Sequence, residues 1–266
     1  MIRRFLFIFL LFSGILVSTV WAGGLWLYEG GTPDLGTAAA GRAALATDAS
    51  TAGANPAGMT HLDRSQMLAA AQGIYVNGKP DVKVSGFGGG DGGNAGGLVP
   101  SGGLHYVHRV TDDLRLGISA GSYFGLGLDY GKNWAGRYYN TEGELLTFGI
   151  NPSAGYRVNN WLSVGAGVNI LYANLTQKVA INNGAVPGQA GQPDGELKID
   201  DDDVAYGFNL GLMLTPQDNT RVGLTYRSEV DLEFNDGASL KNIGPVLQAL
   251  VGGGSLRHLS GRQRPA

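Results

Sequence analysis

The chain contains no cysteine, which excludes disulfide bridges, thiol nucleophiles and thiolate metal ligands. Charged residues are also scarce, at 15% of the 266 residues against about 25% in an average soluble domain. The 19 Lys and Arg residues nearly balance the 22 Asp and Glu residues, for a formal net charge of −3. That balance offers no basic surface to a phosphate backbone, so nucleic acid is not an expected partner. So few charges also argue against an ordinary cytosolic enzyme.

Long apolar runs are missing except at the N-terminus. There Arg3 and Arg4 precede an apolar run, and Val20 and Ala22 occupy the positions that a signal peptidase tests. We predict that residues 1–22 are a cleaved signal peptide, which leaves 244 of the 266 residues; an uncleaved anchor helix is the alternative. After Ala22 no apolar stretch reaches the roughly 20 residues of a membrane helix, so further membrane contact requires another architecture.

Glycine is abundant instead, at 45 residues, more than twice the usual proportion of about 7%. From residue 113 onward, even-numbered positions are mostly apolar and odd-numbered positions are small or polar. A period of two is typical of strands with one apolar face. The expected strands are residues 65–77, 101–110, 113–128, 146–158, 162–172, 204–214 and 222–234.

Two properties favour a membrane barrel over a soluble β-sandwich. Most of the expected strands are long enough to cross a bilayer at a tilt. Their connections also alternate: short turns are expected at 111–113, 159–160 and 216–219, and long connections at 78–100, 129–143 and 176–203. Short turns at one end and long loops at the other are typical of outer-membrane barrels. We therefore predict an all-β fold, an antiparallel transmembrane barrel of outer-membrane type whose strands lie within residues 65–240.

Residues 23–64 lack the alternation and are too few and too weakly apolar to form a core of their own. They can pack as a plug inside the barrel, or form a disordered periplasmic leader. The stretches Gly41–Ala44, Asp48–Thr51 and Asn55–Met59 resemble the N-terminal hatch of the FadL/TodX family of outer-membrane transporters. Trp134–Tyr139 and Leu224–Val230 agree with the same resemblance, which covers residues 28–250.

The resemblance implies a 14-stranded barrel, a hatch on the periplasmic side and a hydrophobic capture site among the external loops. Seven strands are half of that number, and residues 252–266 show no strand pattern. We therefore expect a C-terminally truncated or frame-shifted version of a longer transporter, a partial 14-stranded barrel. On this reading the partners are a hydrophobic small molecule, such as a long-chain fatty acid, and outer-membrane lipid, and the oligomeric state stays open.

Two groups of residues are candidates for gating and for ligand binding. The hatch candidates are Asn55, Pro56, Ala57 and Gly58, because a proline-fixed turn can hold a plug without a large core. Residues 242–251 read as a helix with an apolar stripe, and this begins the loop helix and tail expected at 241–266. The resemblance suggests that its residues Ile243, Val246, Leu247 and Leu250 line an external hydrophobic groove; the alternative is that they cover the rim of the barrel.

Charged residues on the odd-numbered face form a third group, expected to face the lumen. Its members are Arg157, Arg221, Arg227, Glu229, Asp231 and Glu233. They either pair with one another as structural charge ladders or attract an anionic carboxylate head.

No cofactor and no metal site is expected. His105 and His108 fall on opposite faces of a strand, and the acidic run Asp200–Asp203 lacks the spacing of a calcium loop. We take that run as a solvated loop end, with weak cation bridging to lipid left open.

The function that we predict is passive, hatch-gated uptake of long-chain fatty acids or other hydrophobic compounds, captured first on external apolar loops. The alternative is a structural or adhesive barrel whose loops bind a surface partner. No nucleophile motif accompanies a plausible catalytic set, so we expect no enzyme, and an outer-membrane lipase is disfavoured.

Overall fold

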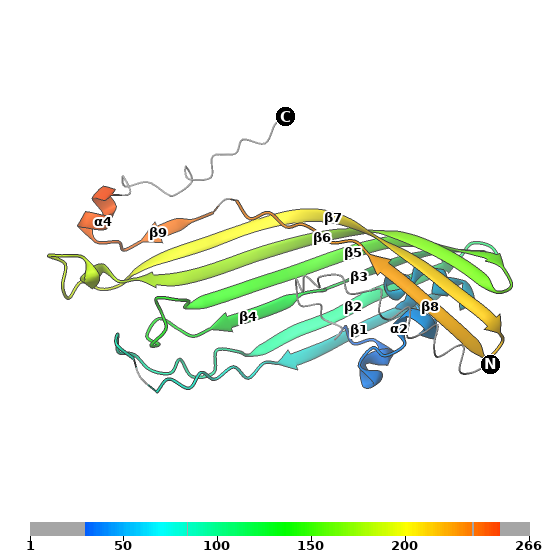
Figure 1. Cartoon of the computed structure of the whole chain (residues 1–266), viewed down its shortest axis with the longest axis horizontal. Coiled ribbons are helices and arrows are strands. Elements are labelled where there is room, and N and C mark those ends of the chain that lie inside the picture. Colours follow the sequence, from blue (N-terminus) through cyan, green and yellow to red (C-terminus); the bar gives the residue numbers. More distant parts are fainter. Residues whose placement is uncertain (1–29, 84, 236, 251–266) are drawn as a thin grey trace, which may run out of the picture.

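The computed structural model describes residues 30–83, 85–235 and 237–250, and they form one curled antiparallel sheet (Figure 1). The order of the sheet is β1-β2-β3-β5-β6-β7-β8, with β4 also paired to β5 and β9 also paired to β7. The strands are β1 Gln66–Tyr75, β2 Leu98–Arg109, β3 Leu114–Gly121, β4 Gly125–Asp129, β5 Glu142–Asn159, β6 Leu162–Ile181, β7 Gly195–Gln217, β8 Thr220–Arg227 and β9 Ser239–Lys241. The expected signal peptide and most of the tail lie outside the described residues.

The nine strands occupy seven positions, because two positions are interrupted. The expected strand 113–128 breaks at residues 122–124 into β3 and β4, which both pair with β5. Gly121 pairs with Gly149 but Gly125 pairs with Leu146, so one extra residue is inserted. The insertion reverses the side-chain alternation. Leu126 consequently shares a face with Leu145, and the expectation that every even-numbered residue of 113–128 shares the apolar face was wrong.

The last position is interrupted in the same way. The expected strand 222–234 ends at Arg227, and β9 later rejoins the same edge of β7. Beyond Arg227, side chains replace the backbone partners of a strand: Phe208 N donates to Ser228 Oγ at 2.9 Å, and Glu233 N donates to Asp203 Oδ2 at 2.9 Å. Glu229, Asp231 and Glu233 therefore lie between strands, which corrects their expected place on the lumen face of a strand.

Strands β6 and β7 are longer than the alternation indicated. The expected connection 176–203 shrinks to residues 182–194, so Asp200–Asp203 belong to β7 and are not a loop end. The Asp200 carboxylate accepts from Thr176 Oγ1 at 3.2 Å and pairs with Lys198. Within the described ranges, no group of His, Asp and Glu side chains is arranged to hold a metal ion.

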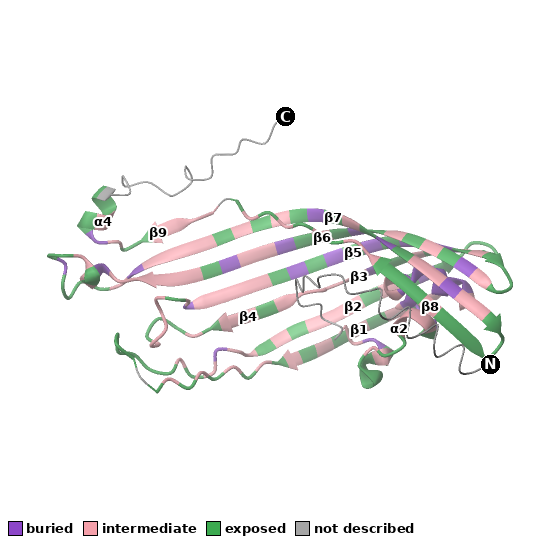
Figure 2. Ribbon diagram, in the orientation of Figure 1, coloured by how far each residue is buried: buried purple, intermediate pink, exposed green. Residues whose placement is uncertain are grey.

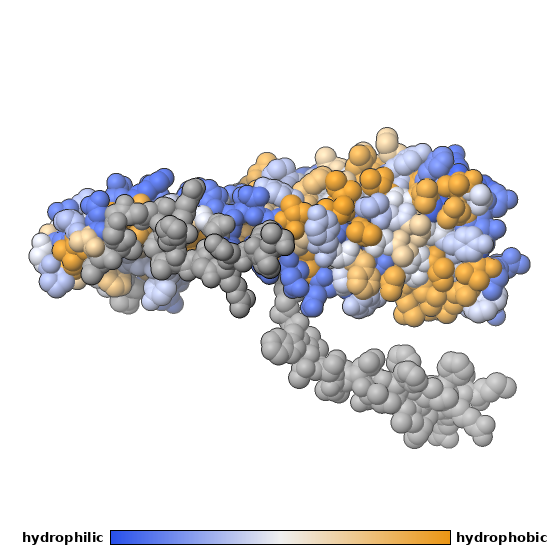
Figure 3. Space-filling view, turned by 90° about the horizontal axis from the view of Figure 1, so that it is seen from above, coloured by the Kyte–Doolittle hydropathy of each residue, from blue (hydrophilic) through white to orange (hydrophobic). Residues whose placement is uncertain are grey.

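The two faces of the sheet differ as the alternation predicted. Even-numbered residues from β5 to β8 point outward and leave large apolar side chains exposed, including Phe148, Val164, Leu210 and Leu224. These side chains gather over the half of the molecule next to the short turns, whereas hydrophilic residues dominate toward the long connections (Figure 3). Most odd-numbered residues on the inner face of β5, β6 and β7 are buried or half-buried, whereas Arg221 and Thr225 of β8 are exposed (Figure 2).

Residues 30–64, here called the N-terminal segment, lie against the inner face at the end with the short turns (Figure 1). The segment contains η1 Pro33–Thr37, α2 Arg42–Leu45, α3 Thr51–Ala54 and η2 Pro56–His61. Its apolar contacts with the sheet are small: one cluster joins Met59 and Leu62 to Val107, and another joins Ala57 to Met213.

Two further helical elements, η3 Asn183–Ala185 and α4 Pro245–Leu250, lie at the opposite end. Among the residues that the structure describes, no helix has the length and apolarity to cross a membrane.

Spin labels at Val164, Leu210 and Leu224 test which face meets lipid. These side chains are 39%, 47% and 60% exposed on the outer face, so in a bilayer we expect efficient relaxation by oxygen and weak relaxation by a water-soluble nickel chelate. A label at Leu171, on the inner face of β6, is the matched control and should show weaker relaxation by oxygen. Strong relaxation by the chelate at all three outer positions would contradict a lipid-facing surface.

Candidate functional site

Three strand glycines form a floor on which the N-terminal segment rests. Gly155 of β5, Gly165 of β6 and Gly211 of β7 are neighbours in the sheet register. A β-carbon on any of them would overlap the segment, at Pro56 O, Ala57 N and Asn55 Oδ1 respectively. Only glycine permits so close an approach of two backbones. The sequence marked these positions as small but did not indicate what lies on them.

Asn55 ties the segment to the sheet. Its side-chain oxygen accepts from Ala57 N at 3.1 Å and caps η2, in which Pro56 holds the first position. Its amide nitrogen donates to Ala43 O at 2.7 Å and to Leu212 O of β7 at 3.1 Å. The Asn55 side chain is fully buried, as are Pro56, Ala57 and Gly58. The structure thus brings the four expected hatch residues together at one contact with β5, β6 and β7.

Four arginines from three strands hold the segment by its backbone carbonyls. Arg227 Nη2 donates to Gly53 O at 2.8 Å and Arg221 Nη1 to Leu45 O at 3.0 Å, while Arg157 Nη2 donates to Thr60 O. We expected these three arginines either to pair with acids or to attract a ligand, but each donates to a backbone carbonyl of the segment, and the Arg227 guanidinium also lies beside the Tyr123 ring. Short helices leave carbonyls without partners, and a guanidinium provides charge-assisted bonds to them.

The fourth of these arginines was not among the expected site residues. Arg115 of β3 is 2% exposed and donates to Leu62 O through Nε at 3.3 Å and Nη2 at 3.2 Å. Its odd-numbered position was the available signal, because it placed a charged residue on the inner face.

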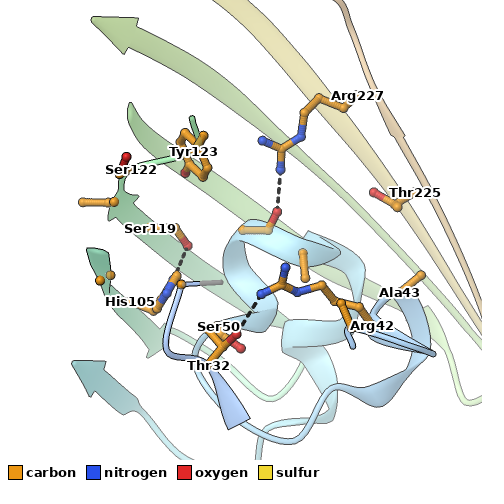
Figure 4. A pocket seen from close by; sticks show the side chains of 18 of the residues that line it. Thr32, Arg42, Ala43, Ser50, His105, Ser119, Ser122, Tyr123, Thr225 and Arg227 are labelled. Carbon is orange, nitrogen blue, oxygen red and sulfur yellow. Dashed lines mark hydrogen bonds between the residues drawn. The ribbon is translucent and has the colours of Figure 1, made fainter. Parts of the chain in front are cut away.

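A cavity of about 550 Å³ lies between the segment and the inner face of the sheet (Figure 4). Its polar lining includes Arg42, Arg227, His105 and Tyr123. Arg42 is fixed by an ion pair with Asp34 at 2.9 Å and by a hydrogen bond to Thr32 at 2.9 Å. His105 Nδ1 lies 3.0 Å from Ser119 Oγ, and the Arg227 guanidinium lies 5.6 Å from the centre of the Tyr123 ring. Cationic and hydroxyl groups therefore meet at the floor of the interior.

Beyond this cavity, toward the long connections, the inner face becomes apolar. Leu126, Leu145 and Leu175 follow one another across β4, β5 and β6 in direct register, and Leu171 lies on the same face. The expectation that the odd-numbered face is small or polar is wrong for this part of the sheet. The interior thus changes from leucine-rich near the loops to polar at the N-terminal segment.

The loops at that end are tied together by the Trp134–Tyr139 stretch. Arg137 Nε pairs with Asp194 Oδ2 at 2.8 Å, and Tyr138 OH donates to Asp194 Oδ1 at 2.8 Å. Arg137 Nη2 also donates to Phe87 O at 3.1 Å, so three long connections meet. Burial, together with the hydrogen bond to Asp194, raises the pKa of Tyr138.

The expected ligand-binding helix is shorter than residues 242–251. Helix α4 begins at Pro245, so Ile243 precedes it, and Asn242 has a positive φ of 52° that interrupts the helical pattern. Val246 is 43% exposed and Leu247 is half-buried; Leu250 ends the helix and Val251 lies outside the described residues. Asn183 anchors the preceding turn by donating to Asn242 O at 2.8 Å.

Long antiparallel strands, short turns at one end and long connections at the other are the features of an outer-membrane β-barrel wall, here with a segment packed on its inner face. The chain belongs to the family described as outer membrane protein transport protein (OMPP1/FadL/TodX), whose family model matches residues 14–261. This membership makes it a bacterial outer-membrane protein and confirms the resemblance found in the sequence.

Individual relatives are similar over most of this chain. The long-chain fatty acid transport protein of Escherichia coli O6:H1 is 31% identical, over 89% of this chain and 57% of that protein. Outer membrane protein P1 of Haemophilus influenzae is 28% identical, over 86% of this chain and 58% of that protein. The chain therefore spans less than two thirds of the length of these relatives.

Solved structures show the same fold. The crystal structure of a Pseudomonas aeruginosa FadL homologue matches with a TM-score of 0.70 at 24% identity, covering 87% of this chain and 59% of that one. The CymD monoaromatic hydrocarbon channel matches with a TM-score of 0.54 at 22% identity, covering 77% and 54%. The curled sheet described above therefore corresponds to part of a barrel wall in these proteins.

Replacing Asn55 by Ala should loosen the N-terminal segment. The substitution leaves the half-buried Ala43 and Leu212 carbonyls without this donor, at about 1 kcal/mol for each lost hydrogen bond. We expect hydrogen exchange at the amides of residues 43–61 to accelerate at least roughly tenfold. Asn182→Ala is the matched control, because Asn182 also caps a 3-10 helix but its capping hydrogen bond is exposed and far from the segment. Equal exchange in the two variants would contradict the role given to Asn55.

Gly165→Ala tests the glycine floor directly. The added methyl would overlap Ala57 N and Pro56, so the segment must shift, and we expect its opening free energy to fall by about 1–3 kcal/mol. Gly127→Ala is the control, since its β-carbon would lie 3.6 Å from Glu144 Cγ, an ordinary contact. Hydrogen exchange at residues 43–61 measures both variants. If exchange at residues 43–61 is as slow in Gly165→Ala as in Gly127→Ala, the role of the glycine floor in seating the segment is refuted.

Proposed function

We propose that the chain forms the wall and the plug of an outer-membrane channel that takes up hydrophobic compounds, such as long-chain fatty acids, by passive diffusion. The single observation that carries this proposal is the N-terminal segment, which lies across the interior on a glycine floor. It is held by arginine hydrogen bonds and by small apolar clusters. Such contacts fix a plug in place without a large core that would have to unfold before the plug moves.

The inner face offers a path suited to an amphiphile. The leucines beyond the segment give an apolar surface for a hydrocarbon chain, where burial contributes roughly 0.8 kcal/mol for each CH₂ group. The cavity beneath them presents Arg42 and Arg227, which suit an anionic head. Capture begins at the apolar residues Ile243, Val246, Leu247 and Leu250 among the external loops, and lipid surrounds the outer face. The name of the E. coli relative supports a fatty acid as solute.

The hatch residues Asn55, Pro56, Ala57 and Gly58 act as the gate in this proposal. The plug can move only when the hydrogen bonds from Asn55 to Leu212 and from the arginines to the segment break. Water can replace the protein partner in each of these hydrogen bonds. The transport step involves no covalent chemistry.

Uptake of a radiolabelled long-chain fatty acid by cells expressing the chain tests the proposal. We expect uptake above an empty-vector control. We expect faster uptake when Asn55 and Pro56 are both changed to Ala, because bonds that must break before the plug moves are then absent. Membrane insertion of both proteins is checked by heat-modifiable gel migration. An inserted, unmodified chain without uptake would overturn the proposal and favour the structural or adhesive barrel.

A further inference from the structure

A second cavity, of about 240 Å³, lies at the end of the molecule with the short turns. Residues of the N-terminal segment and residues of the sheet both line this cavity. His61 belongs to the N-terminal segment, whereas Arg157, Ser163, Thr215 and Arg221 belong to β5, β6, β7 and β8. The lining of this open cavity is therefore complete only while the segment and the sheet are in contact.

Positive groups dominate this cavity. Arg157 and Arg221 each give one hydrogen bond to the segment, and a guanidinium has five N–H donors, so both can bind a further acceptor. The carboxylate of Asp218 lies at the cavity wall, and within the described part of the chain it forms no ion pair with either arginine. The lining thus combines two cations and an imidazole with one acid that neutralises neither arginine by direct contact.

The positive charge of the cavity affects the pKa of the His61 imidazole. Burial, followed by the positive charges of Arg221 and then Arg157, lowers the pKa of His61 below its ordinary value. Its Nε2 lies 3.5 Å from Thr215 Oγ1, which carries no charge, and Asp218 is the carboxylate of the lining. His61 is therefore mainly neutral at neutral pH. An anion placed between the two arginines would oppose their effect and raise the pKa of His61.

We propose that this cavity binds a carboxylate or phosphate group between Arg157 and Arg221, with His61 as a third donor. Guanidinium pairs suit both oxyanions because their planar N–H groups match two oxygens at once. The bound anion would join β5 and β8 to His61, the last residue of η2, and so stabilise the contact between the segment and the sheet. The group belongs either to the solute that the proposed function delivers or to a phospholipid.

Titration of the full chain in a non-ionic detergent, with carbon-13 in its histidine rings, tests the proposal by NMR. Sodium octanoate and inorganic phosphate are the two probes. We expect saturation with at least one of them to shift the His61 titration to higher pH, and the anion to bind more tightly as the pH falls and His61 becomes protonated. His108, exposed on the outer face of β2, should not respond. A His61 titration that neither probe moves overturns the proposal.

Substitutions separate this site from general anion binding. In Arg157→Gln and Arg221→Gln, the His61 pKa should rise before any anion is added, and the dissociation constant should increase at least roughly tenfold for loss of one charge-assisted bond. Arg64→Gln is the matched control, because Arg64 is exposed near the same end and does not line the cavity. Equal affinity in the three variants refutes the site.

The two probes also distinguish the sources of the anion. A response to octanoate but not to phosphate supports a solute carboxylate, and the reverse supports a phospholipid head. Because binding is measured without transport, a chain that binds an anion but shows no uptake would refute the proposed function and leave this site intact.

Discussion

The close approach of two backbones at Gly155, Gly165 and Gly211 is the constraint on which the rest of the structure depends. A side chain at any of these positions would displace the Asn55–Ala57 turn, and with it the bond from Asn55 to Leu212. The glycines have a second consequence. They leave the plug contact with little apolar area, so hydrogen bonds determine its position.

Those hydrogen bonds explain how a segment too small for its own core adopts one arrangement. Four arginines on β3, β5 and β8 donate to carbonyls that short helices leave without partners, at residues 45, 53, 60 and 62. A hydrogen bond from a guanidinium group to a backbone carbonyl requires no carboxylate partner. This suits the part of the inner face that contacts the N-terminal segment, where Asp and Glu residues are few. The same arrangement leaves guanidinium N–H groups of Arg157 and Arg221 for a ligand in the cavity beside His61.

The alternation of residues indicated the strands well wherever register was uninterrupted. It was wrong at residues 122–124, where one inserted residue reverses the faces, and after Arg227, where the Ser228 and Asp203 side chains replace backbone partners. It also predicted an end of β6 and a start of β7 too close to the middle of the sheet. The outer portions of these strands carry their apolar residues, such as Leu175, Leu197 and Ile199, at odd-numbered positions, so the apolar pattern at even-numbered positions no longer indicated a strand there.

The sequence by itself determined the two faces of the sheet, the seven strand positions, the connections of unequal length and the family-like turn at Asn55–Met59. These features follow from the local backbone period of two and from short stretches of chain. The tertiary structure alone decided which carbonyl each arginine binds, where leucines face the interior and where the two cavities form. Asn55 and Leu212 are 157 residues apart, and no local pattern specifies such a contact, because it depends on the register of every strand between them.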